Sequence, residues 1–389
     1  YSLVSTDSQS NISGNIITFT PSTSGTANIQ YKATDSIGGY SAVGTIVVTV
    51  YPTVVPTPPA NVQVTPGASS NTWTIPLSGG NDPYIASVEP IDPSYGTIEL
   101  NKDGTITYTP PVVVSKKLAS ELVKGSKSVT ITYVIKDKTG ATYTKTFTIT
   151  LYDPIVVTSS AYTGEITMSS AKKPLTFSLT ATGGNGTYTY SLVSTDPQST
   201  ISNNIITFTP STSGTATIQY QGTDSNGGKS AVGSITVTVN TAIAANPVSG
   251  GQFTPGSPNE TYNVTLTGGD KPVLTGASVV VSGNGSVTFD ATAGTITYSP
   301  PAAPSSLLKV ATPVTINFTA GDNFGGNYTG SFTISLNDKI VVTPSATTGS
   351  IDIGETPLTF TLSASGGNGT YTYSLVSTDS QSNISGNII

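Results

Sequence analysis

The acidic side chains that recur at matching places are the residues of this sequence with the clearest chemistry. Asp35 and Asp224 stand in TDSIGG and TDSNGG, and Asp322 stands in GDNFGG. Asp153 and Asp338 occupy matching places in LYDP and LNDK. Carboxylate oxygens can bind Ca²⁺, which takes about six to eight oxygen ligands. They can equally accept hydrogen bonds from the backbone of their own turn.

Calcium binding requires several carboxylates in one place, and the sequence does not group them. LYDP and LNDK supply one Asp each, whereas the stretches 48–62 and 237–250 supply none. We therefore interpret the recurring Asp residues, together with Asp137 in KDKTG, as turn-stabilising. We expect no metal and no other cofactor, and we keep Ca²⁺ as the alternative. The alternative ligands are Asp35, Asp224, Asp322, Asp153 and Asp338.

The residues that usually perform catalysis are missing. The chain has no His and no Cys, which removes the commonest general base and the thiol nucleophile. Ser-x-x-Lys occurs within 169–173 and 305–309, but its companion motif Ser-Asp-Asn is absent and Lys-Thr-Gly occurs only at 138–140, within the KDKTG turn. We expect no catalytic residue and no enzyme activity.

The charge and the hydropathy of the sequence argue against a nucleic-acid partner and against a membrane span. The net charge is −6, only 9% of residues are charged, and every positive charge is a Lys. A nucleic-acid partner requires basic patches against phosphate, so we expect none. No run of eighteen apolar residues occurs, so we expect no membrane span in this chain.

A phrase repeats along the chain. YSLVSTDSQSNISGNII occupies both 1–17 and 373–389, and a variant of it occupies 190–206. The distant copies match each other better than either matches the nearer one. This pattern indicates an array whose unit is a pair of modules. We expect both ends of the sequence to be cuts within a longer array.

Two kinds of module alternate in this array. The type-one module carries TFSLTATGGNGTYTYSLVSTD, and the type-two module carries GTIELNKDGTITYTPP or its counterpart GSVTFDATAGTITYSPP. The predicted domains are 1–51 (C-terminal part of a type-one module), 52–153 (type two), 154–240 (complete type one), 241–338 (type two) and 339–389 (N-terminal part of the next type-one module).

Apolar residues alternate with Ser and Thr in short runs, which is the pattern of half-buried strands. Val129, Ile131, Tyr133 and Ile135 share one face of such a run. Turn formers such as GGNG and DSNGG separate the runs. Helical periodicity is limited to a turn or two at 116–125. The predicted fold is all-β, with immunoglobulin-like β-sandwiches in series.

The connection at 48–62 is rich in proline, with Pro52, Pro56, Pro58 and Pro59. Such a composition favours a semi-rigid polyproline linker between modules. The second copy of this connection, 237–250, keeps only Pro247. We therefore expect the two junctions to differ in stiffness.

The landmark stretches resemble known bacterial repeats. DGTITYTPP followed by ITYVIKDKTGATYTKTFTITL is similar to the cadherin-like repeats of giant adhesins. GGNGTYTYSLVSTD with GTATIQYQGTDSNGG resembles the immunoglobulin-like modules of secreted bacterial proteins. The resemblance implies a stalk or fibre outside the cell, and for cadherin-like repeats it implies calcium between modules, for which the junctions here are too poor in acid.

These observations favour a structural and adhesive extracellular repeat protein that forms a long stalk or filament on the cell surface. The expected partners are copies of itself or neighbouring fibres, and also surface glycans or other cells. One alternative is a glycan-binding or spacer region of a secreted polysaccharide-acting enzyme. Against it, Tyr133, Tyr188 and Tyr190 fall on the inward parity of their strands, and we expect Trp73 to anchor a core. Another alternative is a filament subunit that polymerises by strand donation.

Overall fold

The structure is a computed structural model of the chain. It describes residues 1–4, 8–113, 125–169, 173–194, 196–281, 283–302, 312–377 and 380–389. The helical turns expected at 116–125 lie outside the described residues, apart from Gly125. Among the described residues the only helix is the 3₁₀ turn η1, Pro93–Tyr95, and everything else regular is β-strand. The all-β prediction is confirmed.

Residues 154–240 form two four-stranded sheets. Their strands are β15 (Val156–Ser159), β16 (Thr163–Thr167), β17 (Leu175–Thr182), β18 (Tyr188–Leu192), β19 (Ser199–Ser202), β20 (Ile205–Phe208), β21 (Gly214–Asp224) and β22 (Gly233–Asn240). One sheet has the order β15-β17-β20-β19 and the other β16-β22-β21-β18. This division of the strands is that of an immunoglobulin sandwich.

The core of this unit lies between the two sheets, where the alternating pattern places it. Phe177 and Leu179 of β17 pack against Ile218 and Tyr220 of β21, and all four are buried. Tyr188 and Tyr190 of β18 are only half-buried and pack at the margin of this core. The inward parity assigned to these two tyrosines is correct, although they do not reach the centre.

Residues 52–153 form a related sandwich. Its strands are β6 (Val55–Pro56), β7 (Val62–Val64), β8 (Asn71–Trp73), β9 (Leu77–Ser78), β10 (Tyr84–Val88), β11 (Thr97–Leu100), β12 (Ile106–Thr109), β13 (Lys127–Lys136) and β14 (Thr142–Leu151). The sheets have the orders β10-β13-β14-β7, β11-β12-β8 and β6-β9.

Two features of this sandwich match the sequence prediction. The tight NKDG connection predicts a hairpin in which Ile98 and Leu100 face Ile106 and Tyr108. In the β11–β12 hairpin Ile98 pairs with Tyr108 and Leu100 pairs with Ile106, as this prediction requires. Trp73 packs against the core and lies edge-on to Phe147, with 5.5 Å between the ring centroids. Such an edge-to-face pair stabilises a core beyond the area that it buries.

Residues 241–338 repeat this arrangement. The strands are β23 (Ala244–Ala245), β24 (Gln252–Phe253), β25 (Glu260–Asn263), β26 (Leu266–Thr267), β27 (Val273–Val279), β28 (Ser286–Asp290), β29 (Thr295–Ser299), β30 (Thr312–Gly321) and β31 (Asn327–Leu336). The sheets have the orders β24-β31-β30-β27, β25-β29-β28 and β23-β26, which correspond one by one to those of 52–153.

The segments at the two ends hold fewer strands. Residues 1–51 contain β1 (Ser2–Leu3), β2 (Ser10–Ser13), β3 (Ile16–Phe19), β4 (Gly25–Lys32) and β5 (Gly44–Val50). Residues 339–389 contain β32 (Val341–Pro344) and β33 (Leu362–Ser365). Ile46 of β5 is 41% exposed, whereas the matching Ile235 of β22 is fully buried.

The proline-rich connection is not the semi-rigid polyproline linker that its composition suggested. Val54 is buried in the core of 52–153, and Val55–Pro56 forms strand β6 against Leu77–Ser78. Proline is tolerated there because β6 is an edge strand. The segment therefore belongs to the sandwich, and the true connection between modules is short.

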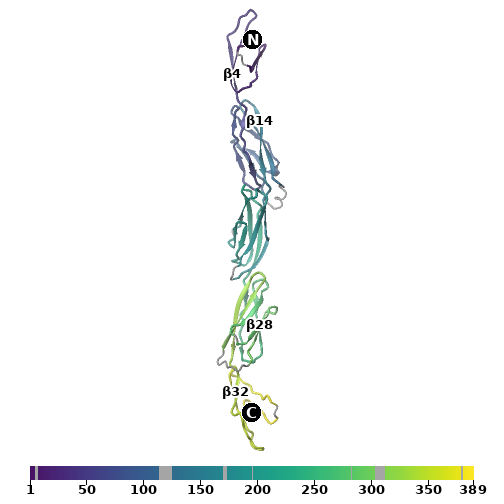
Figure 1. Cartoon of the computed structure of the whole chain (residues 1–389), viewed down its shortest axis with the longest axis vertical. Helices are drawn as coiled ribbons and strands as arrows, with labels where there is room; N and C mark the ends of the chain where they lie inside the picture. The colour runs from purple at the N-terminus through teal and green to yellow at the C-terminus, as the bar shows by residue number, and fades with distance from the viewer. Residues whose placement is uncertain are drawn as a thin grey trace.

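Figure 1 shows the consequence for the whole molecule. The sandwiches follow one another along a single long axis, and the two chain ends lie at opposite ends of it. In such a linear array, the contacts between consecutive modules determine how the modules are held relative to one another.

Candidate functional site

A pair of glycines holds the start of each module in place. Gly183 and Gly184 both adopt positive φ, and Gly184 N donates to Asp153 O at 2.8 Å. A Cβ on Gly183 would lie 2.1 Å from Pro154 O, so only glycine lets the incoming chain pass this closely. The same Gly-Gly turn recurs at Gly79–Gly80, Gly268–Gly269 and Gly366–Gly367. Their second glycines donate to Pro52 O, Thr241 O and Asp338 O, at the boundary where each module begins.

A carboxylate beneath the Gly-Gly turn ties it to the hairpin between the last two strands. Asp224 Oδ1 accepts hydrogen bonds from Asn226 N at 3.1 Å and Gly228 N at 2.9 Å. Its Oδ2 accepts one from Asn185 N at 3.0 Å, directly after the Gly-Gly pair. One side chain therefore fixes two loops at the same end of the module.

The same construction recurs in both type-two modules. Asp322 accepts from Phe324 N, Gly326 N and Asp270 N, and Asp137 accepts from Thr139 N, Ala141 N and Asn81 N. In residues 1–51, Asp35 Oδ1 accepts from Ile37 N at 3.0 Å and Gly39 N at 2.7 Å. The side chains of Asp35, Asp137, Asp224 and Asp322 therefore each accept hydrogen bonds from the backbone of their own turn.

A threonine of the preceding module completes two of these sites. Thr65 Oγ1 donates to Asp224 Oδ2 at 2.6 Å, and Thr65 is fully buried. Thr167 Oγ1 donates to Asp322 Oδ2 at 2.5 Å. Hydrogen bonds to an ionised acceptor are roughly twice as strong as neutral ones. We call this Thr-to-Asp contact the junction hydrogen bond.

Backbone and apolar contacts surround the junction hydrogen bonds. Thr167 N donates to Phe324 O at 3.0 Å across the second junction. Across the first junction, Val113 packs with Ala231 and Val156 in a small apolar cluster. Consecutive modules thus meet in an ordered interface.

The electrostatics of the second junction favour an ionised carboxylate. Burial by itself raises the pKa of Asp322, but the hydrogen bonds from Thr167 and from the backbone amides outweigh it. The net effect is that the pKa of Asp322 lies below its ordinary value of 3.8. The junction hydrogen bond from Thr167 to Asp322 therefore has a charged acceptor at neutral pH.

The remaining calcium candidates do not gather into a site. Asp153 and Asp338 each have a buried Oδ1 without a hydrogen-bond partner, while their backbone carbonyls accept from Gly184 and Gly367. No cluster of three or more His, Cys, Asp or Glu residues close enough to hold a metal ion occurs among the described residues. The carboxylates of Asp224 and Asp322 are engaged by amides and by a threonine.

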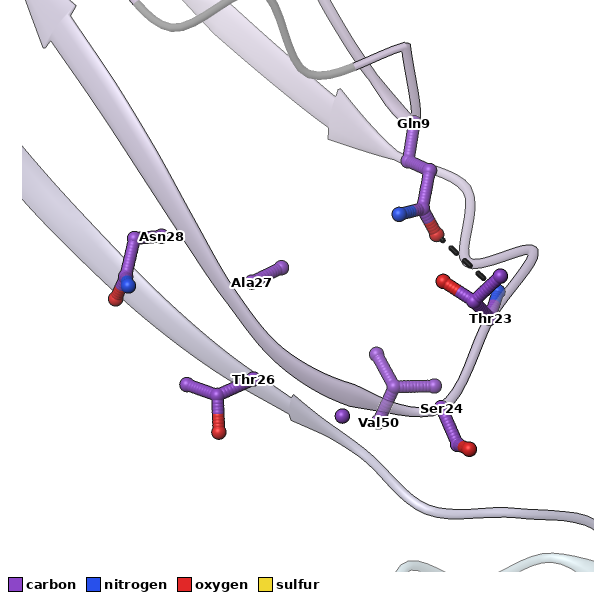
Figure 2. A pocket seen from close by; sticks show the side chains of 8 residues that line it. Gln9, Thr23, Ser24, Thr26, Ala27, Asn28 and Val50 are labelled. Carbon is purple, nitrogen blue, oxygen red and sulfur yellow. Dashed lines mark hydrogen bonds between the residues drawn. The ribbon is translucent and has the colours of Figure 1, made fainter.

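Two other polar features of the chain are the Ser-x-x-Lys stretches and a recess in residues 1–51. The Ser-x-x-Lys stretch 305–309 lies outside the described residues, as does most of 169–173. A polar recess of about 280 Å³ in residues 1–51 is lined by Gln9, Thr23, Ser24, Gly25, Thr26, Ala27, Asn28 and Val50 (Figure 2). Gln9 Oε1 accepts from Ser22 N at 2.7 Å and thereby holds the loop, as Gln198 does at Ser211.

Sequence reasoning missed the threonines and the glycine pairs. Metal-binding sites are recognised in a sequence by grouped acidic residues, and a single Thr does not mark a contact between modules in that way. Two signals were nevertheless present. Thr-Pro-Gly begins at Thr65 and again at Thr254. Gly-Gly followed by Asn or Asp marks this loop at 79–81, 183–185, 268–270 and 366–368, and it also occurs at 325–327.

Comparison with known proteins agrees with this fold. Residues 52–150 match the family model of the bacterial Ig domain. The chain is a tandem array of Ig-like domains. No curated protein matches it.

Several solved structures of multi-domain proteins resemble the chain in fold. An I-band fragment of titin is 12% identical, with a TM-score of 0.32 over 71% of this chain and 95% of that one. Domains 1–4 of the protocadherin gamma B7 ectodomain are 16% identical, with a TM-score of 0.25 over 80% and 83%. Extracellular domains 3–5 of Drosophila OTK are 11% identical, with a TM-score of 0.27 over 73% and 95%.

Ig-like domains in tandem are typical of structural and adhesive proteins. Among the described residues, no helix is long and apolar enough to cross a membrane.

Proposed function

We propose that this chain is part of an extracellular repeat protein that forms a stalk or filament on the cell surface. The ordered junction supports this proposal most directly. Thr65 and Thr167 each reach from one module into the next, and Asp224 and Asp322 receive them. An array whose neighbouring modules are fixed to each other gains length without folding back on itself.

The protein acts without catalysis in this proposal, by spanning distance and by presenting surfaces. We further propose that its units are 1–51, 52–153, 154–240, 241–338 and 339–389. Three separate cores support this division, since each of the three large clusters of buried apolar residues stays within 52–153, 154–240 or 241–338, and only the small Val113 cluster crosses a junction.

Antibodies raised against residues 154–240 test the location. They should label intact, unpermeabilised producer cells, and brief protease treatment of those cells should remove the label. Labelling that appears only after the cells are permeabilised would contradict a surface stalk. A cytoplasmic protein of the same cells is the control for membrane integrity.

The partners in this proposal are neighbouring fibres and surface glycans. The outward positions of β14 are all Thr, and only 9% of the residues of the chain are charged, so little charge opposes contact between fibres. Electron microscopy of the purified chain at increasing concentration tests lateral association. Strictly single, dispersed particles at the highest concentration would count against it.

A glycan-binding role has one specific observation in its favour. Tyr188 and Tyr190 line an open recess of about 510 Å³ together with Asn203 and Asn204, and aromatic faces with amides suit a sugar. Binding to a panel of polysaccharides, compared with Tyr190→Ala, tests this role. Binding that survives the substitution would place the sugar elsewhere.

A further inference from the structure

The surface around Thr254 repeats the surface that forms the first junction. Thr254 begins a Thr-Pro-Gly stretch, as Thr65 does. Each threonine follows a short strand, β24 or β7, that pairs in parallel with the last strand of its module. Thr254 Oγ1 also lies 3.9 Å from where a Cβ of Gly367 would be. Thr254 is thus already beside the Gly-Gly turn of a type-one sequence.

The first and second junctions show what such a threonine requires of the hairpin that receives it. A Cβ on Gly228 would lie 2.4 Å from Thr65 Cβ, and a Cβ on Gly326 would lie 2.7 Å from Thr167 Cγ2. Real Cβ atoms do not approach other heavy atoms this closely, because interiors are packed at contact distance. The receiving hairpin must therefore have glycine four residues after its aspartate.

The hairpins of this chain differ at that position. The hairpin at Asp35 reads Asp-Ser-Ile-Gly-Gly and ends on Gly39, as the type-one hairpin at Asp224 ends on Gly228. The hairpin at Asp137 has Ala141 there, although Ala141 N makes the same bond to the aspartate, at 3.1 Å. Its methyl group occupies the place of an incoming threonine.

We propose that the Thr254 surface binds the Asp-x-x-Gly-Gly hairpin of a type-one module, and that the final glycine selects this hairpin over the one at Asp137. This inference rests on the proposed array and names the partner of its junction. The chemistry of recognition is a threonine hydroxyl bonded to a carboxylate, with the threonine methyl lying on a bare backbone. The hairpin at Asp35 is a further hairpin of the accepted kind.

The requirement for glycine four residues after the aspartate is tested first at the junction between 52–153 and 154–240. The substitutions Thr130→Cys and Thr217→Cys, in a chain that has no Cys of its own, provide attachment points for spin labels that measure the distance between the two modules. Gly228→Ala should broaden the distance distribution about two-fold or more, because modules without a fitted interface move independently. Thr65→Val, which keeps the shape and removes the hydroxyl, should broaden it in the same direction.

Two controls keep this result interpretable. Gly228 does not have a positive φ, and Ala141 occupies the matching position in a folded hairpin, so Gly228→Ala should leave the module itself folded. Thr148→Val changes an exposed threonine of β14 and should leave the distribution narrow. A distribution in Gly228→Ala as narrow as that of the parent would overturn the rule.

The partner of Thr254 is tested in the full chain extended by a copy of residues 207–240 after Ile389, which completes the last type-one module. Labels at Ser331 and at the added copy of Thr217 should give a narrow distribution, and Thr254→Val should broaden it. A broad distribution before substitution, or no change after it, would overturn the proposal. These distances are measured on purified protein, so they do not depend on whether the protein is displayed on a cell.

Discussion

At the scale of single residues, glycine is the residue that the Gly-Gly turn at the start of a module cannot exchange. A Cβ on Gly79 would lie 2.3 Å from Thr53 O, and the φ of Gly79 is +73°. Gly104 has a similar φ of +83°, but nothing lies within 4 Å of its Cβ position. Comparing substitutions at Gly79 and Gly104 therefore separates the free-energy cost of backbone strain, which both share, from the cost of a steric clash, which only Gly79 has.

The substitution Gly79→Ala should destabilise residues 52–153 by about 3 kcal/mol or more, and Gly104→Ala by about 1 kcal/mol. Urea unfolding followed by the fluorescence of Trp73, the only Trp in the chain, measures this module alone. Equal losses in the two variants would show that the incoming chain does not press on Gly79.

Asp137 makes the stability of the same module depend on pH. The side-chain hydrogen bond from Thr139 is the largest cause that lowers the pKa of Asp137 below its ordinary value of 3.8. A lowered pKa contributes stability that is complete above the unfolded value and is lost as the pH falls through the folded value. Asp137→Asn should therefore lower the stability at neutral pH and make its acid decline shallower.

The measurement is the Trp73 unfolding midpoint in urea, taken at several pH values between about 7 and 2. Thr148→Val, which changes an exposed position of the same module without removing a carboxylate, is the control and should keep the slope of the parent. An unchanged slope in Asp137→Asn would contradict the role of this carboxylate.

At the scale of elements, the β13–β14 hairpin carries the core of its module. It runs in continuous register from the Lys127–Leu151 pair to the Lys136–Thr142 pair, with one face buried. Ile131→Ala should cost about 3–4 kcal/mol because it leaves a cavity between the sheets. Thr130→Ala on the exposed face should change the stability by less than about 0.5 kcal/mol. Trp73 fluorescence in urea compares them, and similar losses would contradict the assigned faces.

Strands could be predicted from the sequence because each has its own apolar alternation and its own turn residues. The register of β11 with β12 followed from NKDG, and the inward face of β13 followed from Val129 and Ile131. The role of the proline-rich stretch could not be read in this way. Val54 is buried by residues distant in sequence, and composition alone does not show such a partner.

The junction was predictable only in part for the same reason. Asp224 and Asp322 were found because they lie in recognisable turns, and their bonds to those turns are local. Thr65 lies 159 residues from Asp224, and only the assembled molecule brings the two together. A residue whose partner belongs to another module leaves no periodic signal of its own.

At the scale of the whole molecule, each module should unfold largely by itself. Ile218 is fully buried in the core of 154–240, and no residue of 52–153 belongs to that core. Ile218→Ala should destabilise its own module by about 3 kcal/mol. It should shift the Trp73 transition of the neighbour by less than about 1 kcal/mol, since only junction contacts couple the two.

Amide hydrogen exchange of residues 154–240 confirms that Ile218→Ala weakens its own module, and Trp73 fluorescence follows the neighbour. Equal shifts in both modules would show that the array unfolds as one unit.

The parallel pairing of β16 with β22 has a consequence for a molecule held at its two ends. The chain enters the module at the Gly-Gly end and leaves from the opposite end after Asn240, while the two strands run side by side from Thr163–Thr236 to Thr167–Asn240. Tension would drag these strands past each other, so that their hydrogen bonds are sheared together and not peeled apart one at a time. The strand arrangement that closes each sandwich is thus also the one that best resists being pulled.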